Sequence, residues 1–222
     1  RYTARQLPQM ETAEIVYPKE SAGEIRVLSL QEQRRLTRYL LAEPDECKTG
    51  VLLALLTGLR IGEVCALRWG DIDPGEKTLR VHATMQRLPS DAGPGRTQVF
   101  IASPKSGKSV RTIPMTEQAA ALCGRMRQAD AAFVLTGTEH YMEPRALQYR
   151  LKRYTEDCGL EGVHFHTLRH TFATRCVEVG FEIKTLSEIL GHSSTTVTLN
   201  RYVHSSLELK RSNMEKLKAV GM

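Results

Sequence analysis

The hydrophobic positions of the first part of the chain repeat with helical spacing. Ser29 and Glu32 stand three positions apart, as in a capping box, and apolar residues recur at helical intervals after them, which predicts a helix over residues 30–43. Residues 49–56 are apolar on every side, a pattern typical of a fully buried helix. Gly58 follows this run at a position suited to ending a helix.

The middle of the chain changes from helical to alternating periodicity. After a short predicted helix at residues 62–67, apolar and polar side chains alternate along residues 78–85, which is typical of a half-buried strand. Two further short strands are expected at residues 99–102 and 110–113. The turn residues at 104–108 between them predict a hairpin, and hence a three-stranded antiparallel sheet with a lysine at its tip.

The remainder of the chain is helical in pattern again. From Thr116 onward apolar residues recur one turn apart, as Leu147 and Leu151 do, and residues 207–220 have an amphipathic pattern that predicts a tail helix. The predicted fold class is therefore α+β and mainly helical, with a small three-stranded antiparallel sheet inserted among the helices.

The composition is that of an ordinary globular domain. The 222 residues are 41% hydrophobic and carry a formal net charge of +6, which excludes an acidic disordered tail and indicates nucleic acid only weakly. The longest apolar run is residues 51–56, far below the roughly 20 residues of a membrane span. Five scattered cysteines, never spaced as CxxC, favour a reducing cytoplasm and small core residues over disulfides or a zinc site.

Several side chains have the chemistry that cleavage of a phosphodiester requires. Without a metal, such a reaction needs cations for the phosphate oxygens, a nucleophile, and an acid for the leaving oxygen. The candidates are Arg60, Lys105, His166, Arg169, His192 and Tyr202. Each alone has a plainer explanation, because an isolated arginine is usually a solvated surface residue and most tyrosines are structural.

A metal site is the main competing interpretation of the histidines. His164, His166 and His170 lie close together in the sequence. They lack a nearby carboxylate ligand, and Arg169 would place a fixed positive charge beside any bound cation. We therefore expect no metal and no cofactor.

Five short blocks together resemble the catalytic domain of the tyrosine recombinase (phage integrase) family, in the order and at the spacing of that family. They are TGLRIGEV at 57–64, PK at 104–105, HTLRHTFAT at 166–174, LGHSS at 190–194 and YVH at 202–204. The resemblance extends over residues 26–205. Within the family, the sequence is similar to integrases of conjugative transposons and Gram-positive prophages.

The resemblance implies a mechanism without metal or nucleotide triphosphate. Tyr202 would attack the scissile phosphate to give a 3′-phosphotyrosyl link and a free 5′-hydroxyl, and His166 would accept its proton. A second group of residues would act on the phosphate and on the leaving group. In that group Arg60 and Arg169 would clamp the phosphate oxygens, His192 would hydrogen-bond the phosphate, Lys105 would protonate the leaving 5′-oxygen, and Glu63 would support the clamp.

The resemblance also implies a domain organisation and partners. Residues 1–25 are expected to be an interdomain linker or arm, and 26–222 the catalytic domain, with 203–222 as a tail helix that docks on its own or a neighbouring protomer. The N-terminal core-binding domain of the family has no room before Arg26, so we expect the chain to be a fragment of a longer protein. The expected partners are double-stranded DNA, a homo-tetramer on that DNA, and accessory excision or bending factors, in the bacterial cytoplasm on the nucleoid.

Two other functions fit parts of the same pattern. A type IB topoisomerase would share the nucleophile and the cations but would relax supercoils without exchanging strands. A non-catalytic DNA-binding module would need only the basic surface. The intact residue set favours an integrase that inserts and excises a mobile element.

Overall fold

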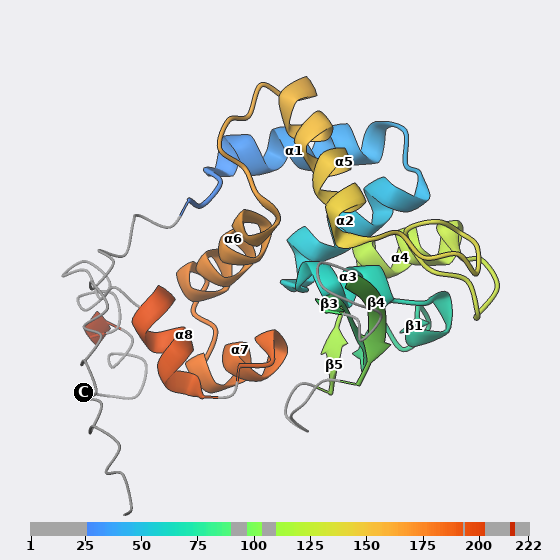
Figure 1. Cartoon of the computed structure of the whole chain (residues 1–222). Coiled ribbons are helices and arrows are strands. Elements are labelled where there is room, and N and C mark those ends of the chain that lie inside the picture. The colour runs from blue at the N-terminus through green and yellow to red at the C-terminus, as the bar shows by residue number, and fades with distance from the viewer. Residues whose placement is uncertain (1–25, 90–96, 104–109, 193, 203–213, 216–222) are drawn as a thin grey trace, which may run out of the picture.

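The computed structural model describes residues 26–89, 97–103, 110–192, 194–202 and 214–215 (Figure 1). The predicted linker at 1–25, Lys105 with its turn, and nearly all of the predicted tail helix lie outside these described residues. The predictions for these segments therefore stay predictions.

The first two helices form as their sequence predicts. Helix α1 (Leu30–Ala42) begins at Ser29, whose hydroxyl accepts from the Glu32 N–H while the Glu32 carboxylate accepts from the Ser29 N–H at 2.8 Å, so the capping box is confirmed. Helix α2 (Glu46–Thr57) is buried along nearly its whole length and ends at Gly58, which has a left-handed φ of 69°. The buried helix is confirmed, and it starts earlier than predicted because Asp45 caps it.

Short elements connect this buried helix to the sheets. Helix α3 (Ile61–Ala66) confirms the short helix predicted after Gly58, and a 3₁₀ turn, η1 (Trp69–Asp71), follows it. Strands β1 (Ile72–Asp73), β2 (Thr78–Val81) and β5 (Arg111–Pro114) form one antiparallel sheet in the order β1-β2-β5. Strands β3 (Thr84–Pro89) and β4 (Thr97–Ala102) form a second, two-stranded antiparallel sheet.

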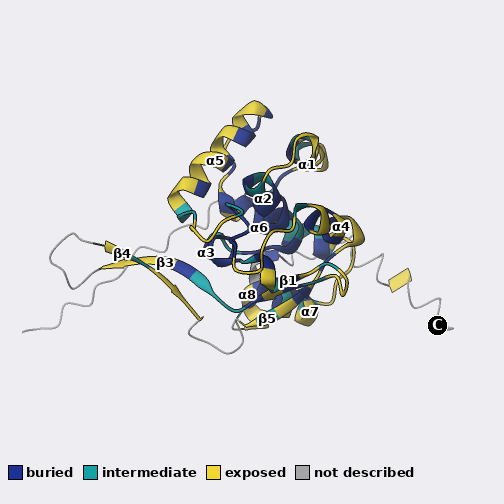
Figure 2. Cartoon of the chain, turned by 90° about the vertical axis from the view of Figure 1, so that its right-hand side faces the viewer, coloured by how far each residue is buried: buried dark blue, intermediate teal, exposed yellow. Residues whose placement is uncertain are grey.

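This arrangement corrects two details of the predicted sheet. The strand predicted at 78–85 is divided between β2 and β3, and residues 99–102 pair with β3 while β5 pairs with β2. The two strands predicted as a hairpin face different surroundings, because β4 is almost entirely exposed whereas β5 carries the buried Ile113. Figure 2 shows β3 and β4 extending together away from the body of the molecule.

The described part of the C-terminal half supplies five more helices, as the helical periodicity predicts. They are α4 (Glu117–Met126), α5 (Pro144–Asp157), α6 (Phe165–Glu178), α7 (Ile183–Leu190) and α8 (Thr195–Tyr202). In Figure 1, α7 and α8 lie beside α6, on the opposite side of the molecule from α4. The mainly helical α+β fold class is confirmed.

Two hydrophobic clusters hold the fold together. The larger one surrounds α2 and includes Trp69. The smaller one joins α6, α7 and α8 through Ala173, Leu190 and Tyr202. All five cysteines are free and buried, which confirms them as small core residues. No helix in the described part of the chain is long and apolar enough to cross a membrane.

Candidate active site

The turn between α2 and α3 positions the first arginine. Gly58 fits between α6 and α7 so closely that a Cβ there would lie 2.6 Å from the Phe172 ring and 2.8 Å from Leu190. Arg60 then occupies the N-cap of α3, and its backbone N–H donates to Glu63 Oε2 at 2.8 Å. Its half-exposed guanidinium donates to Glu63 Oε1 at 2.9 Å, so one carboxylate fixes both the turn and the side chain.

Helix α6 brings a second guanidinium to the same turn. Arg169 is only 4% exposed and donates to the carbonyl oxygens of Gly58 at 2.6 Å and Leu190 at 2.8 Å. Burial, reinforced by the neighbouring charge of Arg60, lowers the pKa of Arg169 to about 9. An anion bound beside these two arginines would offset the unfavourable free energy of burying the Arg169 charge next to Arg60.

A third guanidinium, which the sequence motifs do not include, lies beside them. Arg111 on β5 donates to both oxygens of Glu63 at 2.9 Å and, through Nε, to the Ile189 carbonyl at 2.5 Å. Burial raises the pKa of Glu63, but the hydrogen bonds and charge of Arg111, together with Arg60, outweigh it and hold that pKa below its ordinary value. The sequence shows Arg111 only as one residue of a short alternating strand, which carries no signal of this role.

The three arginines meet at the C-terminal end of α7. The consecutive carbonyl oxygens of Ile189, Leu190 and Gly191 accept from Arg111, Arg169 and Arg60 respectively, the last at 3.0 Å. A helix C-terminus carries partial negative charge, which favours cations there. Gly191 ends α7 with a left-handed φ of 64°.

His192 follows this helix end directly. Its Nδ1 lies 2.8 Å from the hydroxyl of the fully buried Thr198 on α8. This contact fixes the orientation of the imidazole next to the arginines.

The predicted nucleophile ends α8. Tyr202 is 8% exposed, and its hydroxyl lies 2.7 Å from Nδ1 of His170 on α6. The sequence analysis gives His170 no catalytic role, and its position one turn after His166 is the signal that places it beside the site.

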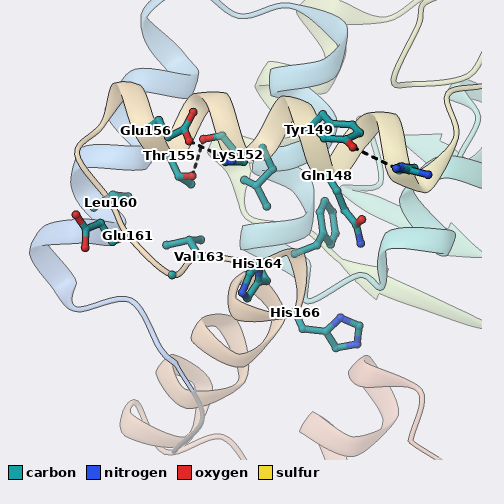
Figure 3. Close-up of a pocket in the computed structure, with 14 residues that line it drawn as sticks. Gln148, Tyr149, Lys152, Thr155, Glu156, Leu160, Glu161, Val163, His164 and His166 are labelled. Atoms are coloured by element: carbon teal, nitrogen blue, oxygen red, sulfur yellow. Dashed lines mark hydrogen bonds and ion pairs between the residues drawn. The ribbon is translucent and has the colours of Figure 1, made fainter.

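His166 lies at the edge of this group. It is exposed on the first turn of α6, with its ring centroid 6.1 Å from that of His170. It also lines a cavity of about 590 Å³ between α5 and the start of α6, and Figure 3 shows it projecting away from the α5 side chains.

The described residues thus bring cations, imidazoles and a phenol into one neighbourhood. Of the sequence-predicted set, Arg60, Glu63, Arg169 and His192 surround the end of α7, and Tyr202 packs against Leu190 of the same helix. Lys105 lies outside the described residues. Within the described ranges, no three His, Cys, Asp or Glu side chains form a group that could hold a metal ion. Fixed cations beside a phenol can bind an oxyanion and present a nucleophile to it.

Comparison with known proteins identifies the family. The model of the phage integrase family matches residues 26–208. The tyrosine recombinase XerC-like protein of Caldanaerobacter subterraneus subsp. tengcongensis is 30% identical, over 87% of this chain and 54% of the relative. The transposase from transposon Tn916 of Enterococcus faecalis is 28% identical, over 86% of this chain and 52% of the transposase.

A solved structure agrees with these sequence matches. The Tn1549 transposon integrase in complex with a circular intermediate DNA is 25% identical and superposes with a TM-score of 0.70, over 91% of this chain and 68% of that one. The resemblance to integrases of conjugative transposons is confirmed. The chain spans about half the length of the curated relatives it matches. Since the family model covers most of the chain, including the arginines, histidines and tyrosine of the site, the chain belongs to the phage integrase family.

Proposed function

We propose that this chain is the catalytic domain of a site-specific recombinase that integrates and excises a mobile element by cleaving and rejoining DNA strands. The observation that carries the proposal is the convergence of Arg60 and Arg169 on the end of α7, with the Tyr202 hydroxyl held by His170 beside them. Two guanidiniums match the oxygens of a phosphate group, and a phenol is a nucleophile for its phosphorus.

The proposed reaction conserves the energy of the phosphodiester bond. The Tyr202 oxygen forms a bond to phosphorus while the bond from phosphorus to the 5′-oxygen breaks, which leaves a 3′-phosphotyrosyl link and a free 5′-hydroxyl. A free phenol has a pKa near 10 and is a poor nucleophile at neutral pH, so the phenol must lose its proton as it attacks, and we assign His166 as the acceptor. Lys105 gives a proton to the departing 5′-oxygen, and a hydroxyl from another strand reverses the steps.

The phosphate-binding residues have separate roles in this proposal. Arg60 and Arg169 neutralise the non-bridging oxygens as negative charge develops, and His192 donates a hydrogen bond to the same phosphate. Glu63 orients the clamp. His170 holds the phenol in place through its 2.7 Å contact, so the nucleophile is oriented before the phosphate arrives.

We also propose the partners that such a reaction requires. Four protomers would act together on two double-stranded sites, with accessory factors that direct excision, in the bacterial cytoplasm. The related Tn1549 transposon integrase has been solved in complex with a circular intermediate DNA, which supports DNA as the partner.

The test uses the full-length protein and a nicked suicide substrate made from the ends of its own element. In the presence of EDTA, the wild type should form a covalent adduct on a denaturing gel, and Tyr202→Phe should form none while still binding DNA. Tyr39→Phe is the matched control, because its hydroxyl bonds Asp157 on the outside of the molecule. A DNA-bound wild type without an adduct would reject the catalytic proposal. A strand-exchange assay then separates a recombinase from a topoisomerase.

A further inference from the structure

Arg111 is a buried cation that none of the family motifs explains. Its side chain is only 7% exposed and bonds Glu63 on α3 and Ile189 on α7. It stands on β5, the strand that follows the segment carrying Lys105. A single guanidinium therefore connects strand β5 to both α3 and α7.

We propose that Arg111 is a positioning residue for strand cleavage. It holds Glu63 and the end of α7 in place, so that Arg60, Arg169 and His192 can contact the same phosphate. This inference rests on the proposed function. It adds a residue that acts through its neighbours and does not itself touch the DNA.

The geometry around Glu63 shows how one arginine can fix another. Glu63 Oε1 accepts from Arg60 Nη1 and Arg111 Nη1, and Oε2 accepts from the Arg60 backbone and Arg111 Nη2, at 2.8 to 2.9 Å. The fork of Arg111 thereby sets the plane of the carboxylate. Arg60 has 36% of its side chain exposed and is held by Glu63 Oε1 and the Gly191 carbonyl, so its direction depends in part on that plane.

Charge gives Arg111 a second effect. If Glu63 paired with Arg60 alone, the carboxylate would neutralise the arginine that must bind phosphate. With Arg111 sharing Glu63, three guanidiniums face one carboxylate, which leaves an excess of two positive charges. That excess matches the two negative charges that a phosphodiester carries as the nucleophile adds.

Through its contact with α7, Arg111 also positions the turn that carries His192. Arg111 donates to the Ile189 carbonyl, and a Cβ on Gly191 would lie 2.8 Å from Arg111 Nη1. The guanidinium therefore packs directly on the residue before His192. Loss of Arg111 would free both the carboxylate and this turn.

The experiment measures adduct formation by the full-length protein on the suicide substrate, at saturating protein and in a single turnover. Arg111→Met should slow the adduct by about 100-fold, the size of effect expected from a misplaced clamp, with DNA affinity within about threefold of wild type. Arg111→Lys keeps the charge but loses the forked guanidinium, and its rate should lie between those of wild type and Arg111→Met. Arg127→Met is the matched control, because Arg127 also bonds two carbonyls and a carboxylate, at the far end of α4, and should cleave like wild type.

A modified substrate separates positioning from mere structural support. Replacing one non-bridging oxygen by methyl removes the negative charge of the scissile phosphate. Cleavage of this substrate therefore depends less on cations aligned with the phosphate oxygens. The deficit of Arg111→Met relative to wild type should then shrink by about tenfold or more, whereas a defect in folding would persist. Arg111→Lys gives the same comparison if the methionine variant does not fold.

Each outcome decides the question. A wild-type rate for Arg111→Met, or an equal deficit on both substrates, would overturn the positioning role while leaving the proposed function intact. Absence of an adduct from the wild type itself would reject the proposed function and this inference together.

Discussion

Replacing Glu63 by glutamine tests whether the arginine cluster also stabilises the fold. The carboxylate is 4% exposed and accepts four hydrogen bonds from Arg60 and Arg111. Glutamine removes the charge and presents an amide to a guanidinium, so Arg111 stays buried without its counter-ion. Removing one partner of a buried pair costs about 3–5 kcal/mol, and the partial exposure of Arg60 favours the lower end, about 3 kcal/mol.

Thermal and urea unfolding measure this loss. For a domain of this size, about 3 kcal/mol corresponds to a decrease in melting temperature of about 6–12 °C. Glu143→Gln is the matched control, since Glu143 pairs with Arg87 on the surface, where 36% and 47% of the two side chains are exposed. That variant should lose less than about 1 kcal/mol.

The dependence on pH gives an independent check. The pKa of Glu63 is lowered from an ordinary value of 4.5, so its contribution to stability is complete above that pH and is lost as the pH falls through the lower pKa of the folded state. The difference in stability between wild type and Glu63→Gln should therefore be constant near neutral pH and shrink in acid. A loss below about 1 kcal/mol at pH 7, or a difference that grows in acid, would refute the reasoning.

Three further substitutions test separate parts of the structure. Arg169→Lys keeps a charge but cannot reach both the Gly58 and Leu190 carbonyls, so adduct formation should fall by about 100-fold while DNA binding in a gel-shift assay changes little; equal losses would make Arg169 a binding residue only. Gly58→Ala combines a left-handed φ with a 2.6 Å approach to Phe172, so chemical denaturation should show a loss of about 1–3 kcal/mol, and an unchanged midpoint would contradict the tight turn. Ser29→Ala removes the cap of α1 and should cost about 1 kcal/mol in the same assay, where a gain would count against the cap.

Local signals in the sequence predict most of the fold. The capping box at Ser29 and the all-apolar run of α2 specify helices through neighbours a few residues away, and both form. Strand pairing is different, because alternation in residues 78–85 continues through the break between β2 and β3. Which strand pairs with which depends on burial at a distance, and the exposed β4 accordingly pairs with the projecting β3.

The same distinction applies to the candidate site. Arg60 and Arg169 are found by motifs because the residues around them build a characteristic turn and helix. Arg111 has no such local context, and its bonds reach residues 48 and 78 positions away in the sequence. His170 is intermediate, since its helix spacing from His166 was visible but its contact with Tyr202 depends on how α8 packs.

The end of α7 explains why these separate segments form one site. Its last carbonyls bind arginines that come from α3, β5 and α6, while its apolar face packs against Tyr202 through Leu186 and Leu190. Successive residues of a helix point about 100° apart, so a shift of α7 by one residue would break the arginine contacts and move the tyrosine together. The arginines of the proposed phosphate clamp and Tyr202, the proposed nucleophile, therefore depend on the position of the same short helix.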